Sequence, residues 1–136
     1  LPFVVLVEGT FAGQLNIAGV VRGSLDSAHI GYWVDQRVAG RGVMPTAVAL
    51  AVDHCFGPVR LHRVEVNIRP ENVASRRVVE KLGFRCEGTR ERFLHISGEW
   101  RDHLTFALVR EEVPGGMVKR WHAAKSIATS ARDTPT

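Results

Sequence analysis

The segment from Val43 to Phe56 constrains the fold more than any other part of the sequence. It contains no glycine, and Pro45 falls in what would be the first helical turn, where its missing N–H costs nothing. Apolar side chains cover most of its circumference, which is typical of a buried helix. Gly57 and Pro58 end it. A buried helix must lie against other apolar elements, so the neighbouring segments decide the architecture.

Strand-like stretches flank this helix on both sides in the sequence. Three precede it as an antiparallel meander, and a fourth strand, a second helix and a final hairpin follow it. The strands are expected at 3–8, 14–22, 28–34, 61–68, 84–96 and 100–110, and the second helix at 73–82. The strand, helix and strand over 28–68 would make a right-handed parallel crossover. The sequence therefore predicts an α/β fold of the α+β kind, with a mixed, mostly antiparallel sheet flanked by helices.

The positive charge of the chain is concentrated near its C-terminus. The formal net charge is +4, but residues 1–112 hold 14 basic and 13 acidic side chains, whereas 113–136 hold four and one. A nucleic-acid-binding domain should carry its basic residues over one face of the fold, so we expect no direct nucleic-acid binding. We divide the chain into a globular core at 1–112 and a basic C-terminal tail at 113–136. The tail is expected to hold one short, weakly ordered helix at 117–128.

The sequence does not support a membrane-spanning, secreted or disulfide-rich protein. No apolar run reaches the roughly 18 residues of a membrane span, and no leader peptide opens the sequence. Cys55 and Cys86 make no disulfide framework and are expected to be reduced, buried thiols, which favours a cytoplasmic setting. Because the sequence starts inside a strand at Leu1, we expect the chain to be a fragment of a longer protein.

A glycine-rich loop between the third strand and the buried helix is the strongest local motif. It reads Arg37-x-x-Gly40-x-Gly42. The start of a helix offers unpaired N–H groups and a partial positive charge, and glycine lets an anion approach the backbone closely. The loop has neither the lysine of a phosphate-binding Walker loop nor the spacing of a dinucleotide fingerprint. A plain glycine turn and a generic anion site both stay open as alternatives.

A second motif opens the second helix. It reads Pro70-x-Asn72-x-x-Ser75 and leads into Glu80-Lys81-Leu82-Gly83-Phe84. Taken alone, Asn72 and Ser75 are typical of helix capping and of a solvated first turn. The order and spacing of the two motifs together are more specific than either motif alone.

Together they resemble the GNAT N-acetyltransferase superfamily, and most of all its ribosomal-protein-alanine N-acetyltransferase branch. The resemblance spans about residues 30–103 and also includes Ile30-Gly31-Tyr32-Trp33-Val34 and Gly98-x-Trp100-x-Asp102-His103. In the family, a strand and two helices usually precede the strand expected here at 3–8. The fold is therefore expected to lack that N-terminal segment, which forms much of the acceptor side.

The resemblance implies a site for acetyl-CoA as co-substrate. The third and fourth strands would separate to hold the thioester, and main-chain groups of Trp33 and Val34 would pair with the pantetheine arm. Asn72 would also bond the pantetheine, and Ser75 would be the acid for the departing thiolate. The amides that hold the pyrophosphate would be those of the loop and helix start, namely Arg37, Val38, Gly40, Arg41, Gly42 and Val43.

The general base is the least constrained part of the site. Glu65 alternates onto the face of its strand opposite Val64 and Val66, so it can point into the gap between the strands. Glu91 and a water relay are the alternatives. Asp102 and His103 are adjacent on a strand and so point to opposite faces, which rules them out as a mutual dyad. The six histidines show no metal-ligand spacing, and no metal is expected.

The resulting prediction is an acetyl-CoA-dependent N-acetyltransferase. It would transfer the acetyl group directly, in a ternary complex, to a primary amine, with the N-terminal amine of a ribosomal protein as the expected acceptor. Two alternatives stay open: acetylation of a small-molecule amine, and a truncated GNAT module that binds CoA or a partner without turnover. A homodimer is also left open.

Overall fold

A six-stranded sheet forms the centre of the molecule. The computed structural model describes residues 1–38 and 40–133, and the side chains of these except at Val34 and 126–133. The strands lie in the order β1-β2-β3-β4-β6-β5. Their bounds are Pro2–Val7 (β1), Thr10–Val21 (β2), Ser27–Val34 (β3), Arg63–Ile68 (β4), Arg85–Ile96 (β5) and Glu99–Val109 (β6). Among the described strands, only β3 and β4 pair in parallel, so the expected mixed, mostly antiparallel sheet is confirmed.

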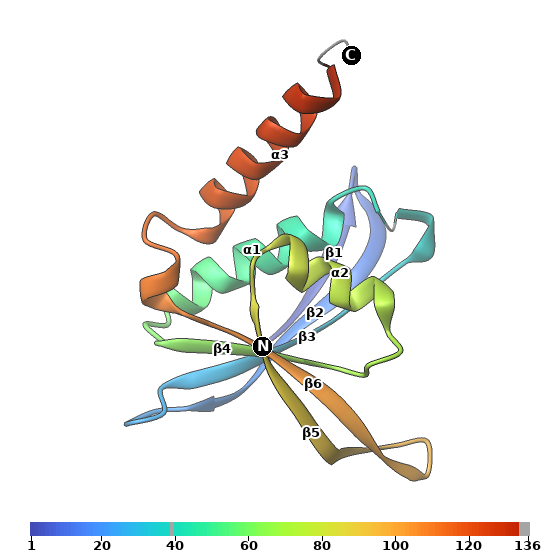
Figure 1. Ribbon diagram of the computed structural model, residues 1–136, viewed down its shortest axis with the longest axis vertical. Helices are drawn as coiled ribbons and strands as arrows, with labels where there is room; N and C mark the ends of the chain where they lie inside the picture. Colours follow the sequence, from blue (N-terminus) through green and yellow to red (C-terminus); the bar gives the residue numbers. More distant parts are fainter. Residues whose placement is uncertain (39, 134–136) are drawn as a thin grey trace.

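Two helices cover one face of this sheet. Figure 1 shows α1 (Val43–Phe56) and α2 (Val73–Lys81) side by side above the strands. The helix expected from its apolar circumference is buried as predicted, since Val48, Ala49 and Val52 have no measurable exposure. They pack against Val64 and Val66 of β4, which alternate onto the same face. The crossover from β3 through α1 to β4 is parallel, as predicted.

The first hairpin is tighter than the sequence suggested. We expected a connection over residues 9–13, but β2 already begins at Thr10, and Glu8 and Gly9 alone make the turn with φ values of 50° and 80°. Two left-handed residues give the turn that fits the twist of a two-residue hairpin. The following residues extend into the ladder, where Phe11 pairs with Leu6 beside a register shift.

The C-terminal tail departs most from expectation. It forms a third helix, α3 (Met117–Asp133), longer than the predicted 117–128. Val113, Met117 and Trp121 are buried in the same core as α1 and β4. The division of the chain at residue 112 stays a prediction, but the first turns of α3 are part of the core packing. Figure 1 shows the helix rising from the start of the tail and continuing away from the sheet.

The two cysteines differ in environment. Both are free, but only Cys55 is buried, whereas Cys86 is exposed on the edge strand β5, so the expectation of two buried thiols is wrong for Cys86. Burial raises the pKa of Cys55 to about 11, which keeps it protonated and unreactive. Within the described ranges, no helix is long and apolar enough to cross a membrane.

Candidate active site

The separation of β3 from β4 creates the first part of the site. The two strands pair only from Ser27 with Arg63 to His29 with Glu65. Beyond those residues β3 continues beside β2 and β4 continues beside β6, so a gap opens between them. A pocket of about 220 Å³ lies in the gap. Its lining comes from β3, β4, the start of α2, and β6, and includes Tyr32, Asn67, Arg69, Asn72, Ser75 and His103.

The start of α2 is fixed at this pocket by two hydrogen bonds. The Asn72 side chain caps the helix, because its Oδ1 accepts the Ser75 N–H at 3.1 Å. The Tyr32 hydroxyl donates to the Ser75 carbonyl at 2.7 Å, and burial raises the pKa of Tyr32, so the phenol stays a donor. The capping role of Asn72 is therefore present, and both predicted residues also line the pocket. Sequence reasoning had not assigned Tyr32 a role.

The glycine loop forms a second pocket with α2. Gly42 is the N-cap of α1 with φ of 78°, and no side chain caps the helix there. A pocket of about 250 Å³ lies between this turn and α2. The predicted residues Val38, Gly40, Gly42 and Val43 line it together.

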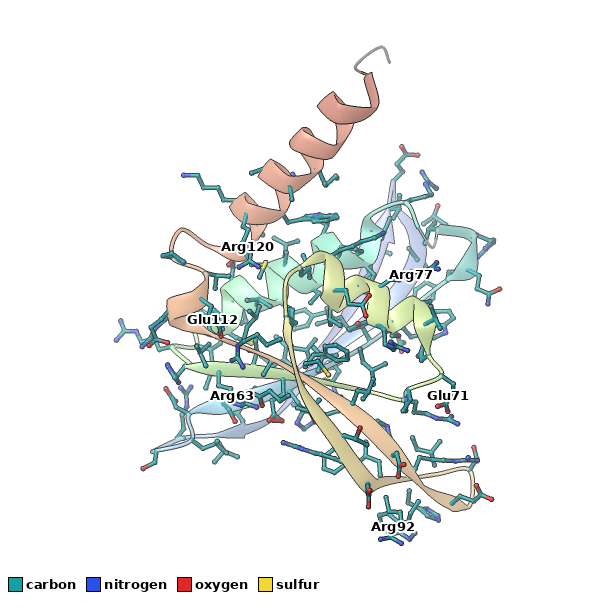
Figure 2. All side chains as sticks on the ribbon, viewed as in Figure 1. Arg63, Glu71, Arg77, Arg92, Glu112 and Arg120 are labelled. Carbon is teal, nitrogen blue, oxygen red and sulfur yellow. The ribbon has the colours of Figure 1, made fainter. Side chains whose placement is uncertain are left out.

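Two basic residues on α2, Arg77 and Lys81, complete this second pocket. Their i, i+4 spacing on a predicted helix was the signal that could have identified them from the sequence. Figure 2 labels Arg77 on α2. Unpaired helix amides facing two cations make an environment suited to phosphate.

The two arginines of the glycine loop lie elsewhere. The Arg37 guanidinium forms a fork with the Asp35 carboxylate, at 3.0 Å from Nε and 2.8 Å from Nη2. This bond, with the Arg37 N–H, lowers the pKa of Asp35 to about 2, so both groups stay charged and paired. Arg37 and Arg41 line a different depression, beside Glu8 and Thr10. The structure therefore does not bring their side chains to the pocket at Gly42.

Trp33 and Val34 lie where the open edge of β3 is expected. Both follow His29, the last β3 residue that pairs with β4. The Trp33 side chain is 54% exposed and stacks on Phe11 at a centroid distance of 6.0 Å. Only the main chain of Val34 belongs to the described part, and it pairs with Gly13 of β2. The proposed pairing with a pantetheine arm uses main-chain groups alone and stays a prediction.

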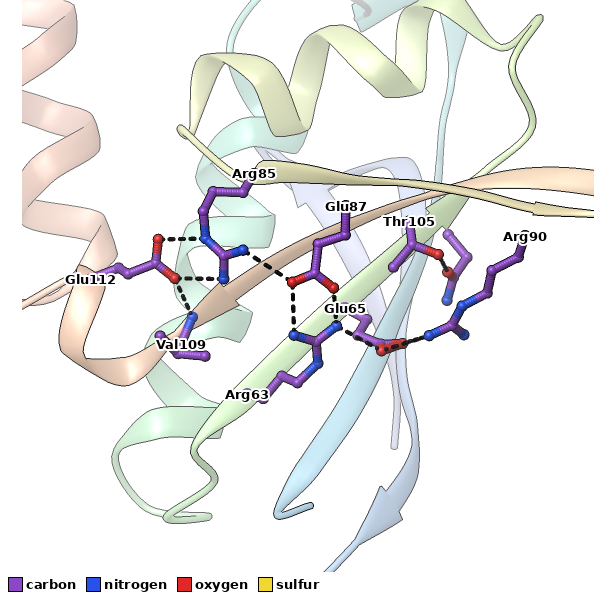
Figure 3. Close-up of polar contacts among 9 residues, drawn as sticks. Arg63, Glu65, Arg85, Glu87, Arg90, Thr105, Val109 and Glu112 are labelled. Atoms are coloured by element: carbon purple, nitrogen blue, oxygen red, sulfur yellow. Dashed lines mark hydrogen bonds and ion pairs between the residues drawn. The ribbon is translucent and has the colours of Figure 1, made fainter. Parts of the chain in front are cut away.

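The predicted base, Glu65, belongs to a network of charged side chains on the sheet face opposite the helices. Its carboxylate accepts hydrogen bonds from Arg63 at 3.1 Å and from Arg90 at 3.2 Å. It is not among the residues that line the gap between β3 and β4. Figure 3 shows the alternating charges of the network. In order, its members are Glu112, Arg85, Glu87, Arg63, Glu65 and Arg90.

Glu87→Gln is expected to make folding less sensitive to acid. Hydrogen bonds from Arg63, and then from Arg85, lower the pKa of Glu87 to about 2. A depressed folded-state pKa stabilises the fold above the ordinary value of 4.5, and this stabilisation is lost as the pH falls from there toward 2. Urea unfolding at about pH 6 and about pH 3 should show a smaller loss of stability in the variant. An unchanged loss, or an equal effect of Glu91→Gln outside the network, would contradict this.

His103 is a site residue that sequence reasoning set aside. It is only 3% exposed and lines the pocket between β3 and β4. Its Nδ1 lies 3.1 Å from the Arg101 carbonyl, which can only accept, so the neutral ring carries its lone pair on Nε2. Asp102 instead accepts the Arg92 N–H at 2.8 Å, consistent with the expected absence of an Asp102–His103 dyad.

Comparison with known proteins agrees with this fold. Residues 1–85 match the family model described as the acetyltransferase (GNAT) domain. The chain is 35% identical over 109 residues to the [ribosomal protein uS5]-alanine N-acetyltransferase of Escherichia coli (strain K12), an alignment that covers 79% of this chain and 56% of that protein.

Two solved structures are also similar. Mycobacterium smegmatis RimJ in complex with CoA-disulfide superposes with a TM-score of 0.87 and 48% identity, covering 92% of this chain and 60% of that one. The ribosomal-protein-S5-alanine acetyltransferase from Vibrio fischeri gives a TM-score of 0.71 and 30% identity, covering 77% and 57%. The chain thus spans little more than half the length of these relatives. Because the family model matches more than half of the chain and the fold agrees, the chain belongs to the GNAT acetyltransferase family.

Proposed function

We propose that the chain binds acetyl-CoA across the two pockets and transfers the acetyl group to a primary amine. One observation carries the proposal: the pockets adjoin at the first turn of α2, where Ala74 lines the pocket at the glycine turn and Ser75 lines the gap between β3 and β4. A ligand with phosphates at one end and a thioester at the other fits this arrangement. The similarity to RimJ, which was solved in complex with CoA-disulfide, supports CoA as the ligand.

Different residues of the chain would bind the phosphates, orient the pantetheine and transfer the protons. The α1 amides, with Arg77 and Lys81, would hold the phosphates, and the open edge of β3 would orient the pantetheine. Bound acetyl-CoA supplies a thioester that an amine can attack. Ser75 would protonate the sulfur as the thiolate departs, and a base on the opposite side of the gap would accept the proton of the amine.

The proposed acceptor is the N-terminal amine of a protein. The similarity to two enzymes named for alanine acetylation of a ribosomal protein supports it. Such an acceptor would place the reaction in the cytoplasm. The test is acetyl transfer from acetyl-CoA to a peptide that begins with alanine, compared with spermidine and a free amino acid. The highest kcat/KM on the peptide is expected. A preference for spermidine would favour the small-molecule alternative, and CoA binding without turnover would favour a non-catalytic module.

Ser75→Ala is expected to lower kcat about a hundredfold, as loss of a general acid does, while the KM for acetyl-CoA changes little. The N–H of residue 75 still bonds Asn72 in the variant, and its carbonyl still accepts from Tyr32, so α2 keeps its position. Steady-state kinetics at saturating acceptor make the comparison. Ser75→Thr, which keeps a hydroxyl, is the control. Equal kcat values in wild type and Ser75→Ala would remove Ser75 from this role.

The pH–rate profile distinguishes Glu65 from His103 as the base. Glu65 is paired with Arg63 and Arg90, whereas His103 lines the pocket itself. We therefore expect His103→Gln to flatten the acidic limb of kcat/KM against pH and Glu65→Gln to retain it. The opposite pattern would indicate that Glu65 is the base. Two unaltered profiles would favour Glu91 or a water relay.

A further inference from the structure

The C-terminal helix α3 is attached to both helices that border the pocket at the glycine turn. At its start, the Asp53 carboxylate of α1 accepts the N–H groups of Met117 and Val118 at 2.6 and 3.0 Å. One turn later, Arg120 donates to the Leu82 carbonyl at the end of α2, at 3.1 Å. Figure 2 shows Arg120 below the first turns of α3, close to both helices. The helix therefore ties α1 to α2.

A chain of hydrogen bonds leads from α3 to the turn itself. Trp121 is 8% exposed, and its Nε1–H donates to the Thr46 hydroxyl at 2.9 Å. That hydroxyl donates in turn to the Gly42 carbonyl at 2.8 Å. Gly42 holds a left-handed conformation, and its carbonyl accepts both the Thr46 N–H, at 3.2 Å, and the Thr46 hydroxyl. Trp121 therefore reaches the Gly42 peptide through the Thr46 hydroxyl, in addition to the first backbone hydrogen bond of α1.

Lys125, one turn beyond Trp121, places a cation beside the same glycine. Its Nζ lies 3.8 Å from the point where a Cβ on Gly42 would stand. The ammonium also lies 5.6 Å from the centroid of the Trp121 ring, within the range of a cation–π contact. Arg77 and Lys81 face the pocket from α2, whereas Arg37 is neutralised by Asp35. Lys125 therefore adds a cation from α3 to the part of the pocket that the start of α1 forms.

We propose that α3 is part of the CoA site: Trp121, through Thr46, positions the turn at Gly42, and Lys125 binds a phosphate of CoA. This inference rests on the proposed function, because it assigns roles at the same site. It would also explain the positive charge of the C-terminal segment, which would attract the phosphate end of CoA.

Calorimetric titration with CoA and with dephospho-CoA tests the Lys125 assignment. Lys125→Met should weaken CoA binding about tenfold, as loss of a charge-assisted contact does. The control is Lys119→Met, which removes an equal charge from an exposed position of the same helix. Weaker binding of CoA alone would assign Lys125 to the 3′-phosphate, and weaker binding of both ligands would assign it to the pyrophosphate. Unchanged affinity for both, or an equal loss in Lys119→Met, would overturn the assignment.

Thr46→Val tests the positioning role. The variant keeps the size of the side chain and removes the hydroxyl that links Trp121 to Gly42. The KM for acetyl-CoA should rise about fivefold while kcat stays near the wild-type value, and Thr46→Ser should restore the KM. A purely structural role would lower the melting temperature and leave the KM unchanged, which would overturn the proposal. Wild-type protein that binds no CoA would instead contradict the proposed function.

Discussion

Gly42→Val should weaken CoA binding about a hundredfold or more, equivalent to roughly 3 kcal/mol. Gly42 adopts φ of 78°, a conformation that a β-branched residue avoids. Its Cβ would stand beside Trp121 and Lys125, at 3.7 and 3.8 Å, and the valine methyl groups would extend further into the turn. The peptides that are proposed to hold the phosphates would then have to move. Calorimetric titration with CoA measures the loss.

Gly23→Val separates this local effect from general strain. Gly23 has a similar φ of 85°, and nothing lies within 4 Å of the position that a Cβ would take. It precedes the start of β3, at the end of the strand that is remote from the site. Both variants should lose about 1–3 kcal/mol of stability from the strained backbone. Only Gly42→Val should lose affinity. Wild-type affinity in Gly42→Val, or an equal loss in Gly23→Val, would argue against the phosphate role of the turn.

Leu108→Ala should destabilise the fold by about 2–5 kcal/mol, the usual range for a large core truncation. Leu108 has no measurable exposure and pairs with Val64 across β4 and β6. Val64 pairs with β3 as well as with β6, so Leu108 lies in the part of the sheet next to the point where the gap between β3 and β4 opens. Urea unfolding followed by circular dichroism gives the change in free energy.

Leu94→Ala is the matched control for the core truncation. Leu94 is 43% exposed on β5, so its removal should change stability by less than about 0.5 kcal/mol. A loss as large as that of Leu108→Ala would contradict the described exposure of Leu94. A loss below about 1 kcal/mol in Leu108→Ala would contradict the described packing.

Elements governed by local patterns could be predicted from the sequence. The alternation of Val64, Val66 and Ile68 places one face of β4 on the core, and the apolar circumference of α1 requires burial; both are observed. The glycine turn and Asn72 were identifiable because they mark helix starts with a known local chemistry. Local rules therefore predict most of the architecture and the glycine turn at which the phosphates are proposed to bind.

Features that depend on distant contacts could not be predicted in this way. The order of α3 comes from Asp53, Thr46 and the Leu82 carbonyl, none of which is near it in the sequence. The same applies to Glu65, whose partner Arg90 lies on another strand. Arg37 is a different case: its partner Asp35 is only two residues away, just before the glycine motif that begins at Arg37.

His103 shows the effect of strand irregularity. It lies on β6 opposite Arg90, where β5 has a register shift between Arg90 and Leu94. Phe93, inside that shift, packs edge-on to the His103 ring at 5.9 Å and helps to bury it. A bulge of this kind changes which side chains cover a strand, and alternation alone does not reveal it.

Calorimetric titration of the chain with acetyl-CoA in phosphate buffer tests the two-pocket site most directly. We expect saturable binding at one site with micromolar affinity, retained when phosphate is present in large excess. Such a result would show that the two pockets recognise the whole ligand and not a phosphate group alone. Folded protein that gives no binding heat, or binding that phosphate abolishes, would contradict the assignment of the pockets to acetyl-CoA.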